Sequence, residues 1–470
     1  MPESLNRRQL LKALGLTGAG LTLASAGLFS NVLSTEAAEA VTDTKPQVVP
    51  QRYWWVKNVD KPTVEIDWKA MKRFNEWETT RGSLPKYRGA DLDKQLNQLQ
   101  KDNLKKWESE KKPGYTTKDM ALNAAVGYGR PEFKFLGPQV ASTPKERGVP
   151  RYEGTPEENS RIVRVALRHM GAATVGFVEL NPETTRKLIY NQEPAPSKKS
   201  IVFENVDVGY EDKDKLVIPD KARWAITFTV QMSTETMKYG PTTLGSLTTG
   251  LSYTRMWLIN SQLHEFIRAL GYNSYGASQF NGLGIAPAMA IMGGLGELSR
   301  LNRMITPEYG PMVRTTFLVT DLPLAPTKPI TFGVMDFCKD CKTCAEMCPS
   351  KALSMEREPY WEVKGAWNNP GHRAWFEDSV KCRNYWNACG TNCGICFSVC
   401  PYAVDDEASL HKIVKGTIAS TTAFNSVLVA ADRAAFPAQP EQPLKNPEDW
   451  WKNENLAEMG IDTRRGGRDI

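Results

Sequence analysis

The cysteines of this chain are confined to one C-terminal stretch, and their spacing constrains the fold more than any other feature. All nine lie between positions 338 and 400. Secreted proteins that rely on disulfides usually distribute cysteines along the chain, where they cross-link loops. Here the first four follow the pattern Cys338-x2-Cys341-x2-Cys344-x3-Cys348-Pro349. This is the spacing of the bacterial ferredoxin run, in which thiolates two residues apart converge on one four-iron cluster.

A second, partial run follows the first, with the pattern Cys393-x2-Cys396-x3-Cys400-Pro401. In two-cluster proteins the cysteine that precedes proline binds the other cluster. A first [4Fe–4S] cluster is therefore expected on Cys338, Cys341, Cys344 and Cys400. A second is expected on Cys348, Cys393, Cys396 and one further thiolate, for which Cys382 and Cys389 compete. Neither zinc binding nor disulfide pairing explains two runs that both end in Cys-Pro.

The first forty residues, 1–40, have the features of a twin-arginine export signal. Arg7 and Arg8 precede a Leu-Leu-Lys sequence, a weakly apolar and glycine-rich stretch covers 13–33, and Ala-Glu-Ala at 38–40 resembles a cleavage site. The glycines make this stretch a poor membrane anchor. Twin-arginine export suits proteins that acquire a cofactor and fold before they leave the cytoplasm.

Composition and charge indicate a globular chain and argue against a nucleic-acid partner. Hydrophobic residues make up 41% and charged residues 24% of the chain, which are ordinary values for folded domains. The 59 basic and 53 acidic residues leave a net charge of +6, and no basic run appears. After the signal, the most apolar stretch is 282–298, which is expected to form a buried helix and not a membrane span.

The region before the cysteines predicts mixed α/β structure. Hydrophobic periodicity predicts helices over 91–112, 156–171, 256–270 and 286–300, and strands over 175–180, 224–230 and 313–319. The second helix begins with a capping box formed by Thr155 and Glu158, with Pro156 at its first position. The proline-rich stretch 322–329 is expected to be a linker into the cluster module.

Taken together, these features resemble the respiratory corrinoid-dependent reductive dehalogenases over nearly the whole chain. Beside the leader and the cysteine runs, the resemblance rests on four stretches: YWWVKNVDKPT at 53–63, GLGELSR at 294–300, PEYG at 307–310 and TDLPL at 320–324. It implies an α/β (α+β) fold, with a nitroreductase-like corrinoid-binding domain followed by a ferredoxin-like double-cluster module. The resemblance also implies that the cobamide binds base-off, because the family uses no histidine ligand. This sequence agrees, since no histidine lies in an Asp-x-His-x-x-Gly context.

The resemblance also implies a domain organisation. The signal at 1–40 would be followed by an N-terminal region, 41–150, that contributes to the substrate pocket. A corrinoid-binding α/β domain would cover 151–330, and the ferredoxin-like domain with both clusters would cover 331–411. The last segment, 412–470, would pack back on the core.

The chemistry implied by the family is the replacement of a carbon-bound halogen by hydrogen, at the expense of two electrons and one proton. The clusters would pass electrons singly to the corrinoid, which supplies the difficult bond cleavage. Family members use a tyrosine as proton donor, assisted by an arginine and an asparagine. The matching residues here are Tyr253, Arg314 and Asn281, with Tyr272 and Tyr275 as rival donors. Further assignments by resemblance are Thr249, Trp386 and Trp55 in the substrate pocket and Cys382 as the last ligand of the second cluster.

The same resemblance predicts the partners and the location of the protein. The substrate would be a small organohalide, used in anaerobic respiration. The exported enzyme would lie at the outer face of the cytoplasmic membrane, held by a small integral-membrane anchor protein and supplied by a quinone-linked electron donor.

Two other functions are compatible with the cysteine runs. One is a non-catalytic periplasmic iron–sulfur electron carrier, which a firmly bound cobamide would exclude. The other is a corrinoid enzyme that reduces epoxyqueuosine in tRNA. The export signal and the modest charge count against the second, because that enzyme is cytosolic and meets nucleic acid.

Overall fold

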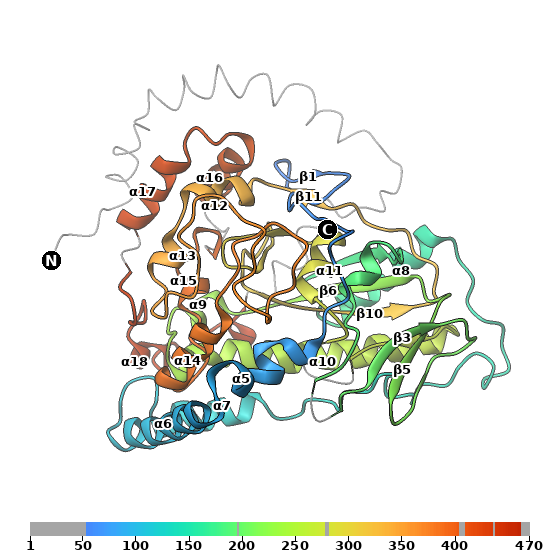
Figure 1. Ribbon diagram of the computed structural model, residues 1–470, viewed down its shortest axis with the longest axis horizontal. Coiled ribbons are helices and arrows are strands. Elements are labelled where there is room, and N and C mark those ends of the chain that lie inside the picture. The colour runs from blue at the N-terminus through green and yellow to red at the C-terminus, as the bar shows by residue number, and fades with distance from the viewer. Residues whose placement is uncertain (1–52, 195–196, 278–281, 404–408, 436–437, 462–470) are drawn as a thin grey trace.

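The computed structural model describes residues 53–194, 197–277, 282–403, 409–435 and 438–461. The expected export signal and Asn281 lie outside these residues. Figure 1 shows the chain with the side sheet of β3 and β5 at one end and the cysteine-bearing helices α12, α13 and α15 at the other. Among the described residues, no helix is both long and apolar enough to cross a lipid bilayer.

The centre of the fold is an antiparallel four-stranded sheet with the order β2-β6-β10-β7. Its strands are β2 (Thr174–Glu179), β6 (Trp224–Gln231), β10 (Val313–Thr320) and β7 (Ser274–Tyr275). These strands are rich in β-branched and aromatic residues, and their side chains alternate between the two faces of the sheet. The three longer strands agree with the expected ranges to within a residue, so this part of the prediction is confirmed.

Helices cover both faces of the sheet. Phe177, Ile226 and Leu318 point to one face, where they share a core with α8 (Pro156–His169) and α10 (Thr243–Leu270). Val178 and Phe317 point to the other face, where they pack with α11 (Ala286–Met292). The sheet is thus the buried middle layer of the domain, and α10, its longest helix, extends towards the cysteine-bearing helices (Figure 1).

Helix α8 begins with the expected capping box. The Thr155 hydroxyl accepts a hydrogen bond from the backbone N–H of Glu158, and the Glu158 carboxylate accepts one from the backbone N–H of Thr155. Helix α10 ends at the expected position, because Gly271 adopts a left-handed conformation with φ of 96°.

Two of the predicted helices differ from the observed ones. Helix α10 begins at Thr243, not at 256, because Thr242 caps its first turn and buried packing stabilises a stretch of low helix propensity. Helix α11 ends at Met292, not at 300. Gly294, with φ of 71°, turns the chain there, and the following residues form β8 (Glu297–Leu298), which pairs with β9 (Met304–Ile305).

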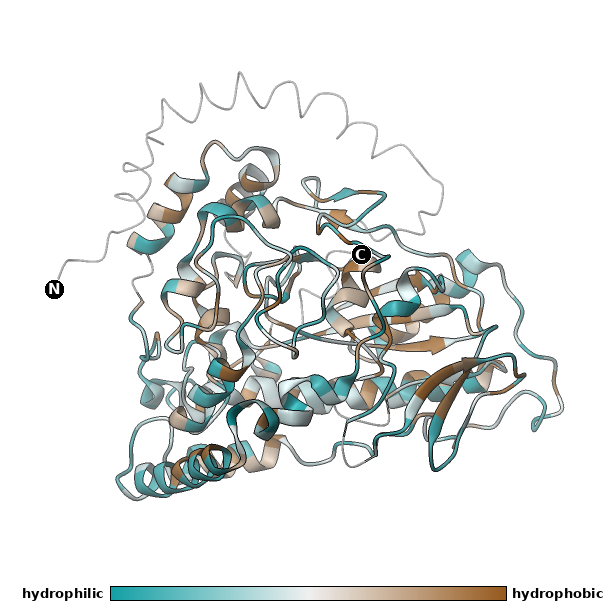
Figure 2. Cartoon of the chain, in the orientation of Figure 1, coloured by the Kyte–Doolittle hydropathy of each residue, from teal (hydrophilic) through white to brown (hydrophobic). Residues whose placement is uncertain are grey.

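The N-terminal region adds short elements along one side of the domain. It contains β1 (Lys57–Asn58), which pairs with β11 (Ile330–Thr331), the 3-10 helix η1 (Glu76–Glu78), and the helices α5 (Thr80–Arg88), α6 (Ala90–Ser109) and α7 (Thr117–Val126). Helix α6 has no buried residue and is mostly hydrophilic in Figure 2, where it contrasts with the brown strands of the side sheet. Helices α5 and α6 contact α14 of the cluster module.

The side sheet has the order β3-β5-β4, and η2 (Thr185–Leu188) leads towards it. Its strands are β3 (Ser200–Glu204), β5 (Lys215–Pro219) and β4 (Tyr210–Glu211). A short helix, α9 (Thr234–Met237), follows β6 and contacts α15 of the cluster module.

The cysteine-bearing part of the chain consists of short helices joined by irregular segments. These are α12 (Val334–Asp340), α13 (Thr343–Glu346), α14 (Ser379–Cys389), α15 (Ile395–Ser398) and η3 (Pro401–Ala403). The chain then continues through α16 (Ser409–Ser420), α17 (Asn425–Ala435), α18 (Pro447–Trp450) and η4 (Glu458–Gly460). This last segment returns to the α/β domain, where Trp450 donates a hydrogen bond to Thr236 and Leu444 N–H to the Lys238 carbonyl.

Candidate active site and cluster sites

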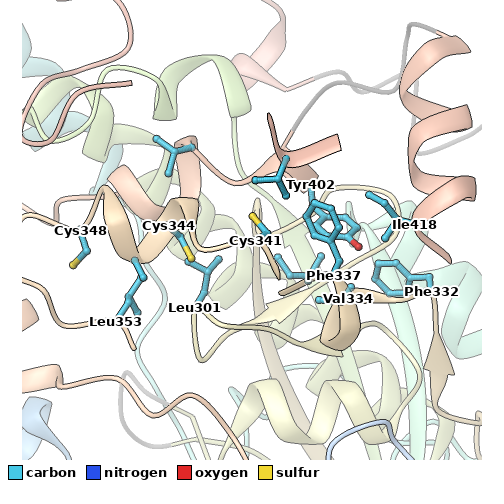
Figure 3. Close-up of a cluster of buried hydrophobic side chains, with 14 of the residues drawn as sticks. Leu301, Phe332, Val334, Phe337, Cys341, Cys344, Cys348, Leu353, Tyr402 and Ile418 are labelled. Carbon is cyan, nitrogen blue, oxygen red and sulfur yellow. The ribbon is translucent and has the colours of Figure 1, made fainter. Parts of the chain in front are cut away.

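Eight of the nine cysteines gather in or against a single buried core. Cys341, Cys344 and Cys348 belong to this core, and five more pack against it: Cys338, Cys382, Cys393, Cys396 and Cys400. Figure 3 shows Cys341 beside Phe337 and Tyr402, with Cys344 and Cys348 progressively further from these rings. None of the nine is in a disulfide. Cys389 is buried elsewhere, where its thiol donates to the carbonyl of Thr391 at 3.1 Å.

The thiols fall into two groups by their electrostatic interactions. Cys344 interacts most with Cys338, Cys400 and Cys341 and less with Cys396, whereas Cys396 interacts with Cys348. Cys382 and Cys393 each interact with Cys396, which places both in the second group. Cys389 also acts on Cys393, although it lies outside the shared core. The eight thiols thus lie in or against one core, and their division into two ligand sets stays a prediction.

Burial dominates the protonation of these thiols. It raises the pKa of Cys338 and of Cys396 to about 12. A bound iron reverses this preference, since a coordinating thiol is deprotonated outright. No three side chains of the described residues are placed to ligate a single metal ion.

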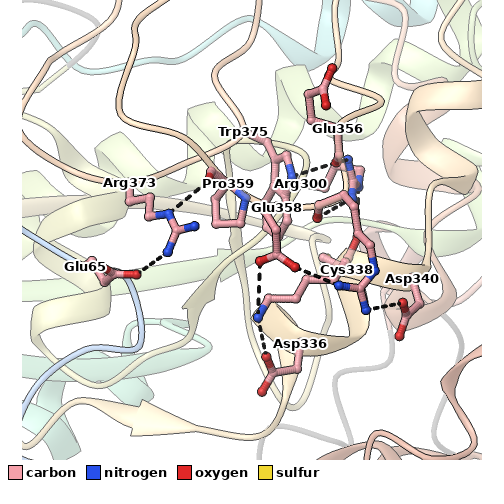
Figure 4. A network of polar contacts seen from close by, with 12 residues as sticks. Glu65, Arg300, Asp336, Cys338, Asp340, Glu356, Glu358, Pro359, Arg373 and Trp375 are labelled. Atoms are coloured by element: carbon pink, nitrogen blue, oxygen red, sulfur yellow. Dashed lines mark hydrogen bonds and ion pairs between the residues drawn. The ribbon is translucent and has the colours of Figure 1, made fainter.

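The motif at 294–300 connects the α/β domain to the first cysteine run. Arg300 is fully buried and donates hydrogen bonds to the carbonyl of Cys338 at 2.6 and 3.0 Å and to that of Cys341 at 3.1 Å. It also reaches the carbonyls of Ser354 and Glu356, at 2.7 and 2.6 Å. Figure 4 shows this guanidinium between Cys338 and Trp375.

Glu297 also connects the two regions, but it accepts hydrogen bonds where Arg300 donates them. Its carboxylate accepts hydrogen bonds from the backbone N–H of Phe332 at 2.6 Å and of Val334 at 3.2 Å, just before the first cysteine. It also accepts one from the Thr63 hydroxyl of the N-terminal region, at 2.8 Å. Burial raises the pKa of Glu297, and these donors oppose the shift. Glu297 and Arg300 were expected only as parts of a family motif, and their contacts could not be read from the sequence.

Two of the three expected catalytic residues meet beside the first half of α10. The Arg314 guanidinium, from β10, lies 5.0 Å from the ring centre of Tyr253. Its Nη2 atom donates to the Thr249 hydroxyl at 3.2 Å. Tyr253 and Thr249 are one turn apart on α10, so both face Arg314 from the same side. The third expected residue, Asn281, lies outside the described residues.

Two residues that the sequence did not single out complete this group. Asn392 donates to the Thr249 hydroxyl at 3.2 Å, and the ring of Phe397 lies 5.8 Å from the Arg314 guanidinium. Both come from the second cysteine run, adjacent to Cys393 and Cys396. Their positions next to Cys393 and Cys396 are the sequence signal from which they could have been identified.

Arg314 carries its charge in a half-buried setting. Burial lowers its pKa, while Tyr253 and Cys396 oppose the shift. Its Nε atom is buried without a hydrogen-bond partner among the described residues. A buried donor without an acceptor is costly, which suggests that the site is completed by a bound molecule. Arg81 of α5 also interacts electrostatically with Tyr253 and is a further residue that sequence reasoning missed.

The two rival tyrosines are occupied elsewhere. The Tyr275 hydroxyl is buried and accepts a hydrogen bond from the backbone N–H of Gly209 at 2.9 Å. Tyr272 donates to the carbonyl of Tyr152 at 3.0 Å. Neither tyrosine contacts Arg314 in the described part of the chain, so the geometry favours Tyr253 as the donor.

The two tryptophans assigned to the pocket have different surroundings. Trp55 is buried in the cysteine-bearing core and stacks on Tyr53 at 4.4 Å. This packing gives Trp55 a structural role and does not support its assignment to the pocket. Trp386 lies on α14, where the Arg383 guanidinium is 4.6 Å from its ring centre. Arg383 interacts electrostatically with Arg81, so Trp386 stays a candidate for the pocket wall.

A cavity of about 270 Å³ opens between the N-terminal region, α11 and the segment before α14. Much of its lining is apolar, from residues such as Val64, Met71 and Ile291. One part is polar and is formed by Asn302, Arg303, Asn368, Asn369, His372 and Ser379. Two buried atoms in this polar part, Asn369 Oδ1 and His372 Nδ1, have no hydrogen-bond partner among the described residues.

Comparison with known protein families adds to this geometry. Residues 51–324 match the model of a reductive dehalogenase subunit, and residues 337–403 match that of a 4Fe-4S double cluster binding domain. The second match covers all eight cysteines of the two sets and also Cys389, so the expected pair of [4Fe–4S] clusters is confirmed at the level of the domain.

Individual relatives are consistent with these matches. A tetrachloroethene reductive dehalogenase of Sulfurospirillum multivorans is 36% identical over 59% of this chain and 57% of its own length. A trichloroethene reductive dehalogenase of Dehalococcoides mccartyi is 28% identical, with 96% of this chain and 97% of the relative covered. The solved structure of a catabolic reductive dehalogenase, NpRdhA, has a TM-score of 0.60 and 19% identity. That likeness, over 88% of this chain and 53% of the other, is one of fold and confirms the mixed α/β architecture.

Proposed function

We propose that this chain, which belongs to the reductive dehalogenase family, removes halide from a small organohalide with the help of a corrinoid and two [4Fe–4S] clusters. The reaction would be R–X + 2 e⁻ + H⁺ → R–H + X⁻. One observation carries the proposal: a tyrosine, an arginine and a threonine meet directly beside the second cysteine run. A pure electron carrier has no need of this arrangement, and the family match does not favour the epoxyqueuosine-reducing alternative.

The first cluster would bind to Cys338, Cys341, Cys344 and Cys400, and the second to Cys348, Cys382, Cys393 and Cys396. Support comes from the shared core and from the two electrostatic groups. Cys389 would be the spare cysteine, because its thiol is engaged with a backbone carbonyl outside that core.

The corrinoid would supply the cleavage of the carbon–halogen bond. The polar part of the cavity fits the amide-rich edge of such a cofactor, because Asn369 Oδ1 and His372 Nδ1 are buried without partners there. These two residues would hold amide groups, and the apolar lining would contact the ring. Such buried polar atoms are expected to be satisfied by a ligand when the site is complete.

Tyr253 would donate the proton that the product carbon requires. The Arg314 cation beside the Tyr253 ring would stabilise the negative charge left on the phenolate oxygen. Thr249 and Asn392 would act as positioning residues, since the Thr249 hydroxyl accepts from both Arg314 and Asn392. Burial of Arg314 strengthens this electrostatic effect, because little water screens it.

The remaining proposals concern location and partners. The leader at 1–40 supports export by the twin-arginine route. The enzyme would then be peripheral at the outer face of the membrane, held by a small membrane anchor protein and supplied by a quinone-linked donor. Its electrons would enter at one cluster and leave from the other towards the cavity.

The experiment that tests the proton donor is the substitution Tyr253→Phe, assayed for dehalogenation with reduced enzyme. General acid catalysis contributes about a hundred- to ten-thousandfold, so turnover should fall on that scale. Iron and corrinoid content should stay unchanged, because the hydroxyl holds neither cofactor. Tyr272→Phe is the matched control and should keep nearly full turnover. Full activity in Tyr253→Phe would move the donor to another residue.

A further inference from the structure

Arg303 and Glu377 form an ion pair at the boundary between the α/β domain and the cluster module. Arg303 Nη2 lies 2.7 Å from Glu377 Oε2. The Glu377 side chain is only 6% accessible, whereas that of Arg303 is 41% accessible and lines the cavity. The carboxylate is thus enclosed by protein, and the cation reaches from it to the cavity.

The two charges are held in place by backbone contacts on two separate segments. The carbonyl of Arg303 accepts hydrogen bonds from Ser299, one from its backbone N–H at 3.1 Å and one from its hydroxyl at 2.8 Å. The carbonyl of Glu377 accepts one from the Asn368 side chain at 3.2 Å. Glu377 also directly precedes Asp378, the residue that caps α14. Neither charge can therefore move far from the other.

The pair lies next to the cysteines proposed for the second cluster. Both Arg303 and Glu377 interact electrostatically with the thiols of Cys382 and Cys396. Among the described residues, Arg314 of the catalytic group also interacts electrostatically with Arg303. Arg303 therefore lines the cavity, pairs with the buried Glu377 carboxylate and interacts electrostatically with the second cysteine set.

A buried charge at this position affects the cluster in a direction that can be derived. Reduction adds one electron to a cluster, [4Fe–4S]²⁺ + e⁻ → [4Fe–4S]⁺. A nearby cation stabilises the reduced form and a nearby anion destabilises it. Side chains around a metal centre tune its redox behaviour in this way. In an ion pair the two effects largely cancel, so removal of either partner exposes the effect of the other.

We infer that the Arg303–Glu377 pair positions opposite charges beside the second cluster and thereby sets the ease with which that cluster is reduced before it passes electrons towards the cavity. The inference rests on the ligand set proposed above. In this role Arg303 and Glu377 are positioning residues, because they act through the cluster and not on the substrate.

The test is a redox titration of the complete holoenzyme, followed by electron paramagnetic resonance under anaerobic conditions. Arg303→Gln should make the second cluster harder to reduce, and Glu377→Gln should make it easier. Each change should displace the reduction equilibrium by about tenfold or more, the scale of one unit charge several ångströms away at an effective dielectric constant near 20. Arg303→Lys keeps the charge and should restore most of the native value. The first cluster should shift less in all three variants.

A matched pair of control variants is available where the cluster module meets the N-terminal region. Arg373 and Glu65 form an ion pair of 2.6 Å, with side chains that are 32% and 60% accessible. Arg373→Gln and Glu65→Gln should leave both clusters at their native values, because solvent screens these charges.

The possible outcomes separate the inference from the proposed function. If both cluster signals are present but the reduction equilibrium of the second cluster shifts in the same direction in Arg303→Gln and Glu377→Gln, the inference is wrong. The ligand set would still stand. A native enzyme with only one cluster signal would instead overturn the ligand set. If Arg303→Gln does not fold, Glu377→Gln and Arg303→Lys still decide, since an unchanged second cluster in Glu377→Gln contradicts the inference. Iron and corrinoid are measured in every variant.

Discussion

Arg300→Met removes the guanidinium that joins the α/β domain to the first cysteine run while keeping an unbranched apolar side chain in its place. The native side chain donates to four backbone carbonyls, those of Cys338, Cys341, Ser354 and Glu356. It also stacks against Trp375, with 4.6 Å between the guanidinium carbon and the ring centre. Methionine can replace the stacking contact but none of the hydrogen bonds.

The cost follows from the carbonyls left behind. The Glu356 carbonyl keeps the hydrogen bond from Trp375 Nε1 at 3.0 Å, so three carbonyls lose their donor. A buried acceptor without a partner costs about 1–3 kcal/mol, so the three amount to at least about 3 kcal/mol. This is a large share of the stability of a typical domain, about 5–15 kcal/mol. The loss falls on the loop that carries Cys338 and Cys341, both proposed ligands of the first cluster. We therefore expect the first cluster to be lost while the second is retained.

The assay is iron and sulfide analysis of anaerobically purified protein, together with thermal unfolding. The native chain should hold about eight iron atoms, as two four-iron clusters require. Arg300→Met should hold about four and should unfold at a lower temperature. Arg300→Lys should resemble it, because an ammonium group lacks the planar fork that reaches several carbonyls. About eight iron atoms and an unchanged unfolding temperature in Arg300→Met would refute this reasoning.

Three further predictions concern other parts of the chain. Cys382→Ser should abolish the resonance signal of the second cluster, whereas Cys389→Ser should leave both signals intact; the reverse result would exchange the two residues. Burial lowers the pKa of His264 to about 4. The unfolded chain then binds a proton below about pH 6.5 that the folded chain does not, so stability falls as the pH falls from about 6.5 to 4. Urea unfolding at pH 7 and pH 5 should show that His264→Asn avoids about 2 kcal/mol of this loss, and an equal loss in both proteins would contradict the assignment. Replacement of Arg7 and Arg8 by lysine should leave the precursor in the cytoplasm, as fractionation would show, and normal export would exclude the twin-arginine route.

The sequence predicted those parts of the molecule in which local pattern and tertiary structure agree. The strands of the central sheet are rich in buried β-branched residues, and the capping box of α8 is a local device that needs no distant partner. The cysteine sets were predictable for a related reason. Ligand spacing reflects the geometry of a cluster, which is the same in every protein that binds one.

The parts that were missed depend on distant contacts. The first half of α10 is rich in glycine, threonine and serine, which have low helix propensity, and only burial against neighbouring elements stabilises it. The end of α11 was missed because glycines at 293 and 294 are compatible with a helix until the left-handed turn at Gly294 is known. Trp55 is buried in the core that holds the cysteines, and its assignment to the pocket stays a prediction.

The junction at 297–300 explains why one short motif can fix the relation between the two modules. A backbone segment presents both N–H donors and C=O acceptors, and each kind must be satisfied when it is buried. Glu297 satisfies donors ahead of the first cysteine, and Arg300 satisfies acceptors within the run itself. Two opposite charges, three residues apart in sequence, therefore hold the cluster loop from both sides. Electron transfer needs a fixed separation between the cluster and the cavity, and this junction holds the cluster loop in place. Arg303, which lines the cavity, lies only three residues further along the chain.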